Sequence, residues 1–182
     1  HTCRELSKTV MTIGPSGKAS LRLPSTGGDL VLITPLGHSL EHLTPDELTV
    51  IDLEGEPVEE QLIPSSESAL HLLVYKTRPD VKSVIHTHPV FSSAIAVSFD
   101  EIPPIIDEMV IKIGGSIKVA NYAFPGTEEL AENACQALGE RTATLQRHGC
   151  RPAVTLRSQR GPGQLVGSSP LPLFHHFWPR PR

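Results

Sequence analysis

The chain has 182 residues, of which 38% are apolar and 20% are charged. This is a typical composition for a globular protein, and the length predicts one domain with a sizeable core. No apolar run approaches the roughly 20 residues of a membrane span. The first ten residues also lack the long apolar stretch of a secretory signal peptide. We therefore expect no membrane partner and no signal peptide.

The net charge of -4 hides an uneven distribution. Residues 1–150 hold all 20 acidic side chains and 11 of the 16 basic ones, which gives -9, whereas residues 151–182 hold five arginines and no acid, which gives +5. These arginines are scattered among prolines and form no basic helix, so we expect no nucleic-acid partner. The three widely spaced cysteines, Cys3, Cys135 and Cys150, do not resemble a disulfide framework and indicate a reducing, cytoplasmic compartment.

Strand-like and helix-like segments alternate along the first 150 residues. Apolar and β-branched runs predict strands at 20–24, 29–35, 48–55, 81–86, 116–122 and 142–146. Apolar residues at helical spacing predict helices at 68–80, 89–98 and 127–138. The last of these is the clearest, because Thr127 suits an N-cap and acidic residues fill the first turn. The alternation indicates an α/β fold, with three layers of helices around a mixed sheet.

Two histidines, His86 and His88, follow a short apolar run in the sequence SVIHTHP. Side chains two residues apart on an extended chain face the same way, so both rings would converge on one point, as zinc ligands do. A histidine pair at a strand end that stands alone is more often structural than metal-binding. A metal site needs at least one more ligand, for which His148, in QRHGC, is the candidate, and Glu67 could add a carboxylate.

The six other histidines are assigned no role in the site. We interpret three of them as surface or core residues and two as incidental members of the C-terminal tail, namely His38, His42 and His71, and His175 and His176. His1 stands at the start of the sequence and carries no motif.

Several motifs occur together in a characteristic order. They are LVLITPLGHSLEHLTPDELTVIDLEGE, PSSESALHLLVYKTRPDVKSVIHTHP, IPPIIDEMVIKIGG and YAFPGTEELAENACQAL, followed by RHG. Together they resemble the class II aldolase and adducin-head family over roughly residues 10 to 149. The resemblance implies a three-layer α/β/α sandwich of the class II aldolase type with a mixed central sheet.

The resemblance also implies roles for individual residues. It implies a zinc ion held by His86, His88 and His148, and an acid/base role for Glu67. For the substrate phosphate it implies the glycine-rich segment GPSGKAS, the next glycine loop and the serines of PSSE, that is, Gly17, Lys18, Ser20, Gly37, Ser65 and Ser66. Hydroxyl and backbone N–H groups near a helix N-terminus suit an anion. Two residues depart from the pattern, because Lys18 replaces an asparagine and Leu36 replaces a serine or threonine.

The activity that this resemblance implies is a zinc-dependent lyase. It would cleave a small ketose 1-phosphate, such as L-fuculose 1-phosphate, to dihydroxyacetone phosphate and an aldehyde through a metal-stabilised enediolate. The acidic pair Asp107 and Glu108 keeps an alternative open, since a glutamate at position 108 resembles the acid/base residue of methylthioribulose-1-phosphate dehydratases. The pair could equally be a solvated acidic patch. A non-catalytic, adducin-head-like or degenerate scaffold is the third hypothesis. The family usually forms cytoplasmic homotetramers.

The C-terminal segment departs most from the family pattern. Residues 1–149 form the predicted class II aldolase/adducin-like domain, whereas 150–182 contain six prolines and show no sustained periodicity. The family continues past the HG motif with an apolar strand and an amphipathic helix. We therefore interpret residues 150–182 as an atypical, poorly ordered tail in which this strand is missing, and a shifted reading frame would explain it.

Overall fold

A computed structural model describes residues 2–8, 15–58, 62–147 and 153–158. The helices are α1 (Thr2–Lys8), α2 (Ser68–Thr77), α3 (Val90–Ser98) and α4 (Glu128–Leu138), with a 3-10 turn η1 (Pro45–Glu47) and a π-helical segment η2 (Met109–Ile113). The strands are β1 (Lys18–Leu23), β2 (Leu30–Ile33), β3 (Thr49–Asp52), β4 (Ser83–Thr87), β5 (Glu101–Ile102), β6 (Ile117–Ala120), β7 (Ala143–Gln146) and β8 (Ala153–Ser158). No helix among these residues is long and apolar enough to cross a membrane.

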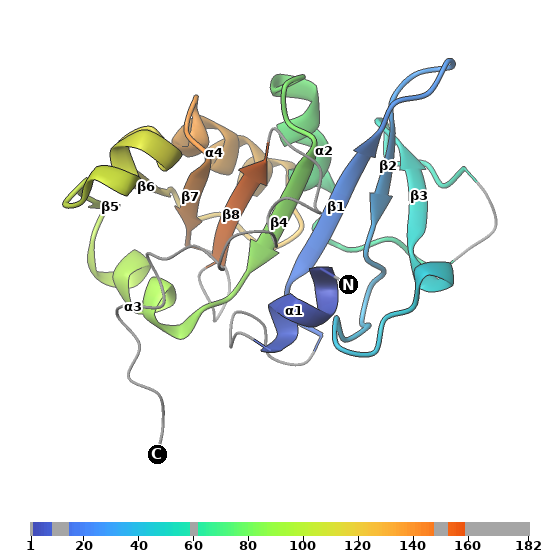
Figure 1. The fold of residues 1–182 in the computed structure, drawn as a ribbon, viewed down its shortest axis with the longest axis horizontal. Helices are drawn as coiled ribbons and strands as arrows, with labels where there is room; N and C mark the ends of the chain where they lie inside the picture. Colours follow the sequence, from blue (N-terminus) through green and yellow to red (C-terminus); the bar gives the residue numbers. More distant parts are fainter. Residues whose placement is uncertain (1, 9–14, 59–61, 148–152, 159–182) are drawn as a thin grey trace.

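The described strands form one sheet in the order β3-β2-β1-β4-β8-β7-β6-β5 (Figure 1). Neighbouring strands run antiparallel, except β6 and β7, which are parallel. The predicted mixed sheet is therefore confirmed. All nine predicted elements are present, whereas α1, η1, β5, η2 and β8 have no counterpart among the elements expected from the sequence.

Strand β8 corrects one expectation about the C-terminal segment. The strand that we expected to be missing after residue 150 is present at Ala153–Ser158, where it lies between β4 and β7. Its sequence, AVTLRS, includes two β-branched residues and suits a short strand. The prolines and arginines around it obscured this signal. Residues 148–152 and 159–182 lie outside the described residues.

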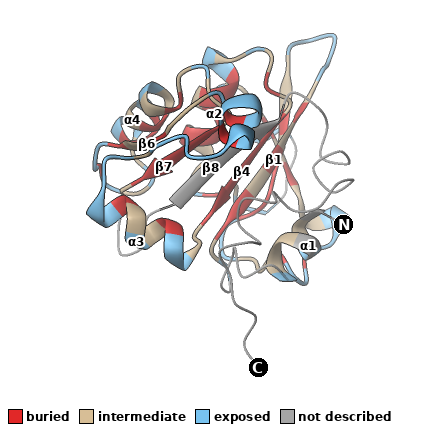
Figure 2. Ribbon diagram, turned by 60° about the vertical axis from the view of Figure 1, so that its left-hand side comes forward, coloured by how far each residue is buried: buried red, intermediate tan, exposed pale blue. Residues whose placement is uncertain are grey.

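Helices cover both faces of the sheet. On one face, α2 packs its residues Leu72, Val74 and Tyr75 against the strands, and α4 packs beside α2. On the other face, Ala96 of α3 and Met109 of η2 belong to a second cluster, whose other members include Ile113, Ile117, Ala143 and Leu145. Figure 2 shows the buried residues concentrated in the strands between these layers. The predicted three-layer α/β/α arrangement is confirmed.

Strand register assigns the histidine pair to the α2 face. His86 of β4 pairs with Thr155 of β8, and Thr155 pairs with Thr144 of β7. Paired residues of neighbouring strands lie on the same face of a sheet, so positions 86 and 144 share a face. Leu145, the next residue along β7, faces the opposite, α3 side, where it joins the apolar cluster. The α2 layer is therefore the one that contains the candidate site.

Candidate functional site

The two histidines of the HTH motif converge at the end of β4. His86 is fully buried in β4, a strand whose five residues are all buried, and His88 follows the strand at a half-buried position. The Nε2 atoms of His86 and His88 lie 2.9 Å apart, and the rings meet edge to face with centroids 4.9 Å apart. The period-2 geometry of the strand therefore brings two imidazole nitrogens to one point, as their spacing predicts.

This nitrogen pair fits a shared metal ion. Two imidazole ligands of a tetrahedral zinc ion, each about 2.05 Å from the metal, have nitrogens about 3.3 Å apart. Opening the 2.9 Å separation by a few tenths of an ångström would satisfy that geometry. Within the described residues, no group of three His, Cys, Asp or Glu side chains is arranged to hold a metal. The third predicted ligand, His148, lies outside the described residues.

The strand that precedes residue 148, β7, nevertheless ends at the same edge of the sheet as the histidine pair. Strands β4 and β7 are both antiparallel to β8, so they run in the same direction. Their C-terminal ends, Thr87 and Gln146, therefore lie at the same edge of the sheet. The segment that follows β7 begins at the edge where His86 and His88 converge.

Glu67 lies at the start of the helix that covers the histidines. It is the N-cap residue of α2, and its backbone N–H donates to the hydroxyl of Ser65 at 3.1 Å. Burial raises the pKa of Glu67, and the nearby ammonium of Lys18 partly offsets this effect. Its Oε2 atom is buried without a hydrogen-bond partner among the described residues. Such a carboxylate oxygen is available to a ligand or a proton.

Lys18 provides a buried positive charge next to this carboxylate. It pairs with His86 in the β1–β4 register, and its side chain is 6% exposed. Its Nζ donates to the carbonyl oxygens of Pro15 at 3.2 Å and Pro35 at 3.1 Å. Burial lowers the pKa of Lys18, whereas Glu67 raises it. Lys18 thus links the two glycine loops, which an asparagine of the usual pattern is too short to do in the same way.

The remaining phosphate-binding candidates occupy different environments. Gly17 is buried with φ of 98°, and Gly37 is exposed with φ of 76°, so both turns use conformations that favour glycine. Ser65 is buried beside Glu67, and Ser66 is exposed. The hydroxyl of Ser20, in contrast, points into the α2 layer and contacts His71 and Tyr75.

The structure separates Asp107 and Glu108 from the histidine pair. Both are exposed, and Glu108 is the N-cap residue of η2. That segment packs through Met109 and Ile113 on the α3 side of the sheet, opposite α2. Within one chain, Glu108 therefore lies on the opposite side of the sheet from His86 and from Glu67, with which it would have to act as a dehydratase acid/base residue.

His71 is the residue that sequence reasoning underestimated. It lies on α2 one turn after Glu67, is fully buried, and has its ring centroid 6.5 Å from that of His86. Burial, together with the charge of Lys18, lowers the pKa of His71 to about 3. The available signal was the spacing from Glu67, because residues four apart share a helix face.

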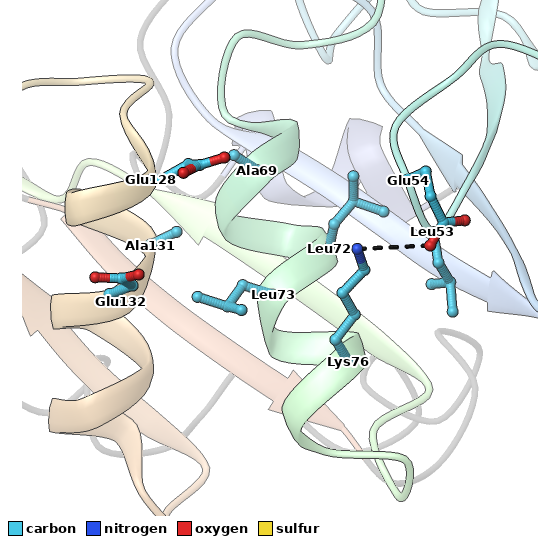
Figure 3. A pocket seen from close by; sticks show the side chains of 9 residues that line it. All are labelled: Leu53, Glu54, Ala69, Leu72, Leu73, Lys76, Glu128, Ala131 and Glu132. Atoms are coloured by element: carbon cyan, nitrogen blue, oxygen red, sulfur yellow. Dashed lines mark ion pairs between the residues drawn. The ribbon is translucent and has the colours of Figure 1, made fainter.

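A pocket between α2 and α4 is a separate feature (Figure 3). Apolar residues of both helices form its floor, and an ion pair between Lys76 and Glu54 spans 3.7 Å at one side. Glu128 and Glu132 of α4 lie at the other side. None of the predicted site residues lines it, so it is not part of the histidine site.

Residues 1–151 match the family described as Class II Aldolase and Adducin N-terminal domain. The chain belongs to this family. The resemblance inferred from the HTH and PSSE motifs is thereby confirmed.

The similar proteins are named as sugar-phosphate aldolases. The chain is 38% identical over 147 residues to a 5-methylthioribulose-1-phosphate/5-deoxyribulose-1-phosphate aldolase of Escherichia coli O45:K1 (strain S88 / ExPEC), covering 81% of the chain and 67% of that relative. It is equally similar to the L-fuculose phosphate aldolase of Escherichia coli (strain K12), covering 66% of that protein. A solved structure of L-fuculose 1-phosphate aldolase superimposes with a TM-score of 0.76 at 31% identity, covering 87% of this chain and 72% of that one. The chain spans about two thirds of the length of its curated relatives.

Proposed function

We propose that this chain is a zinc-dependent aldolase that cleaves a small ketose 1-phosphate to dihydroxyacetone phosphate and an aldehyde. The observation that carries the proposal is the convergence of the His86 and His88 nitrogens in the same layer as the half-buried Glu67. Relatives named as aldolases for L-fuculose phosphate and for 5-methylthioribulose-1-phosphate support this substrate class. Membership of a family of metal-dependent aldolases supports zinc, with His86, His88 and His148 as its ligands.

The chemistry divides between the metal and the side chains of the α2 layer. When bound, the zinc ion supplies Lewis-acid stabilisation of negative charge on the substrate oxygens. In the cleavage, the C4 hydroxyl loses its proton to solvent and becomes the aldehyde carbonyl, while the electron pair of the C3–C4 bond passes to the enediolate of dihydroxyacetone phosphate. Protonated Glu67 then delivers its proton to C3 and is reprotonated from solvent. Burial raises the pKa of Glu67, which brings it closer to the value that an acid/base catalyst needs near neutral pH.

The glycine loops and the PSSE turn would hold the substrate phosphate. Lys18 fixes the spacing of the two loops through its bonds to Pro15 and Pro35, and it contributes positive charge. Gly17, Gly37, Ser65 and Ser66 offer backbone N–H and hydroxyl donors to an anion. The hydroxyl of Ser20 is already engaged with His71 and Tyr75, so we assign Ser20 to support of the site and no longer to direct phosphate contact.

The substrate is tested by product analysis. Purified protein loaded with zinc is incubated with L-fuculose 1-phosphate and with 5-deoxyribulose 1-phosphate, and dihydroxyacetone phosphate is quantified. We expect release with at least one substrate, and the Glu67→Gln variant to lower kcat by about 10²-fold or more. Incubation with methylthioribulose 1-phosphate separates the alternative, since loss of water without cleavage would identify a dehydratase. Folded, zinc-loaded protein that transforms none of the three substrates would favour a non-catalytic scaffold.

We also propose that the chain works as a cytoplasmic homo-oligomer, a tetramer as is usual in the family. Ten of the 14 large apolar side chains that are exposed in the described residues lie between positions 90 and 124. They come from α3, from η2 and from the loops around them, at 90, 91, 97, 99, 105, 106, 110, 111, 122 and 124. Exposed apolar side chains in such number within one stretch of the chain are usually covered by another surface, so we expect a second copy of the chain to contact them.

A further inference from the structure

A chain of three polar side chains crosses the core of the α2 layer. The hydroxyl of Tyr75 lies 2.8 Å from the hydroxyl of Ser20, which lies 2.7 Å from Nδ1 of His71. All three residues are buried, and Arg22 stacks over the Tyr75 ring at 5.0 Å from its centroid. Burying such a row of polar groups is costly unless every proton has an acceptor.

Counting the protons of this row assigns the tautomer of His71. Burial raises the pKa of Tyr75, so its hydroxyl keeps its proton. That proton needs an acceptor in the core, and among the described residues the Ser20 hydroxyl oxygen lies in hydrogen-bond reach, 2.8 Å away. The Tyr75 proton is therefore donated to Ser20, and the Ser20 proton to Nδ1 of His71. A ring nitrogen that accepts this bond carries no proton, so the ring proton of the fully buried His71 lies on Nε2.

This Nε2–H group has no acceptor among the described residues, although it is buried. In an imidazole ring Nε2 lies farther from the backbone than Nδ1, and the His71 ring centroid is 6.5 Å from that of His86. One turn earlier on the same helix face, Oε2 of Glu67 is a buried acceptor that also lacks a partner there. A donor and an acceptor that are both buried and both unsatisfied complement each other.

We propose that His71 is a positioning residue, which donates a hydrogen bond from Nε2–H to the Glu67 carboxylate, directly or through one water molecule, and so orients it for proton transfer. The hydrogen bonds from Tyr75 to Ser20 and from Ser20 to Nδ1 hold the His71 ring in place. This inference rests on the proposed function only in taking Glu67 as the acid/base residue. It assigns His71 no contact with substrate or metal.

Two variants at position 71 test the role in catalysis. His71→Leu fills the space without a donor, whereas the side-chain amide of His71→Gln places an N–H group close to the position of Nε2. We expect His71→Leu to lower kcat by about 10- to 100-fold, with KM and zinc content unchanged. His71→Gln should restore most of kcat. Equal losses in both variants, or loss of zinc from either, would overturn the proposal.

The tautomer of wild-type His71 gives a test that needs no activity. In protein labelled with ring ¹⁵N-histidine, the signal absent from His71→Leu identifies this residue by NMR. We expect a neutral ring with its proton on Nε2, and a shift to mixed tautomers in Ser20→Ala. A proton on Nδ1 in wild type would refute the row of donors, even if the variants fold poorly. A wild-type enzyme that releases no dihydroxyacetone phosphate but shows the Nε2–H tautomer would refute the proposed function alone.

Discussion

The two helical layers bury different chemistry. In the α2 layer, apolar residues surround buried Lys18, Ser20, Arg22, His71 and His86. On the α3 side, α3, η2 and the sheet bury an apolar cluster, and the buried polar residues of α3 and of the α3 face of β4, Ser92, Ser83 and Thr87, carry uncharged hydroxyl groups. Ten large apolar side chains between positions 90 and 124 stay exposed. Polar groups are costly to bury and are kept where a ligand or a network satisfies them. Exposed apolar side chains are retained where another surface covers them.

This difference separates the tasks of the two layers. The α2 layer carries the proposed catalytic groups, and burial of its polar residues lowers the stability of the fold while it provides groups for catalysis. The α3 layer carries the proposed contacts between subunits. Changes in the α2 layer should therefore affect activity and pH dependence first, whereas changes on the exposed α3 surface should affect assembly first.

The largest effect is expected from His86→Ala in the α2 layer. Loss of this ligand would release the metal and lower kcat/KM by about 10³-fold or more, which corresponds to about 4 kcal/mol. Zinc per chain is measured by mass spectrometry, together with dihydroxyacetone phosphate release. His42→Ala is the matched control, because the His42 side chain is 82% exposed. Full zinc content in His86→Ala would contradict the metal site.

A smaller effect is expected from the pH dependence of stability. His71 has a pKa of about 3 in the folded chain, against 6.5 as its ordinary value, so the unfolded chain binds the proton first as pH falls. The free energy of unfolding therefore has its full value with respect to His71 above about pH 6.5, and it decreases progressively as the pH falls from there toward 3. By pH 5 the loss amounts to about 2 kcal/mol.

Urea unfolding in the presence of a chelator measures this loss without interference from bound metal. Wild type should lose about 2 kcal/mol more than His71→Gln between pH 7.5 and pH 5. The raised pKa of Glu67 changes the free energy of unfolding in the opposite direction, because it favours the folded state at low pH. Both proteins contain Glu67, so this effect cancels in the comparison. Equal losses in the two proteins would show that His71 titrates in the folded chain.

The smallest effect on the stability of the chain is expected on the α3 side. Ile111 of η2 is 79% exposed, so Ile111→Asp should change the free energy of unfolding of one chain by no more than about 0.5 kcal/mol. It should nevertheless dissociate the oligomer, because it places a charge in the apolar surface. Analytical ultracentrifugation measures the mass. Val58→Asp is the control, since Val58 is also exposed but lies outside the 90–124 region. An unchanged mass for Ile111→Asp would place the interface elsewhere.

Local patterns predicted most of the fold. The helix α4 starts as expected at Thr127, whose hydroxyl accepts from the backbone N–H of Leu130 at 3.2 Å. The strands β1 to β4 were predicted from their apolar and β-branched runs. Strand β8 was missed, because six residues between proline-rich stretches give a weak signal and pairing with β4 and β7 decides their structure.

The sequence by itself determined the family, the layered α/β fold and the convergence of His86 and His88, because each depends on motifs or on a local period of two or 3.6 residues. Only the tertiary structure decided what surrounds them. Sheet register placed Lys18 opposite His86, and the packing of α2 on β1 joined Tyr75, Ser20 and His71 into one row. Such contacts join residues far apart in the chain, and they form because each buried polar group must find a partner wherever the fold brings one.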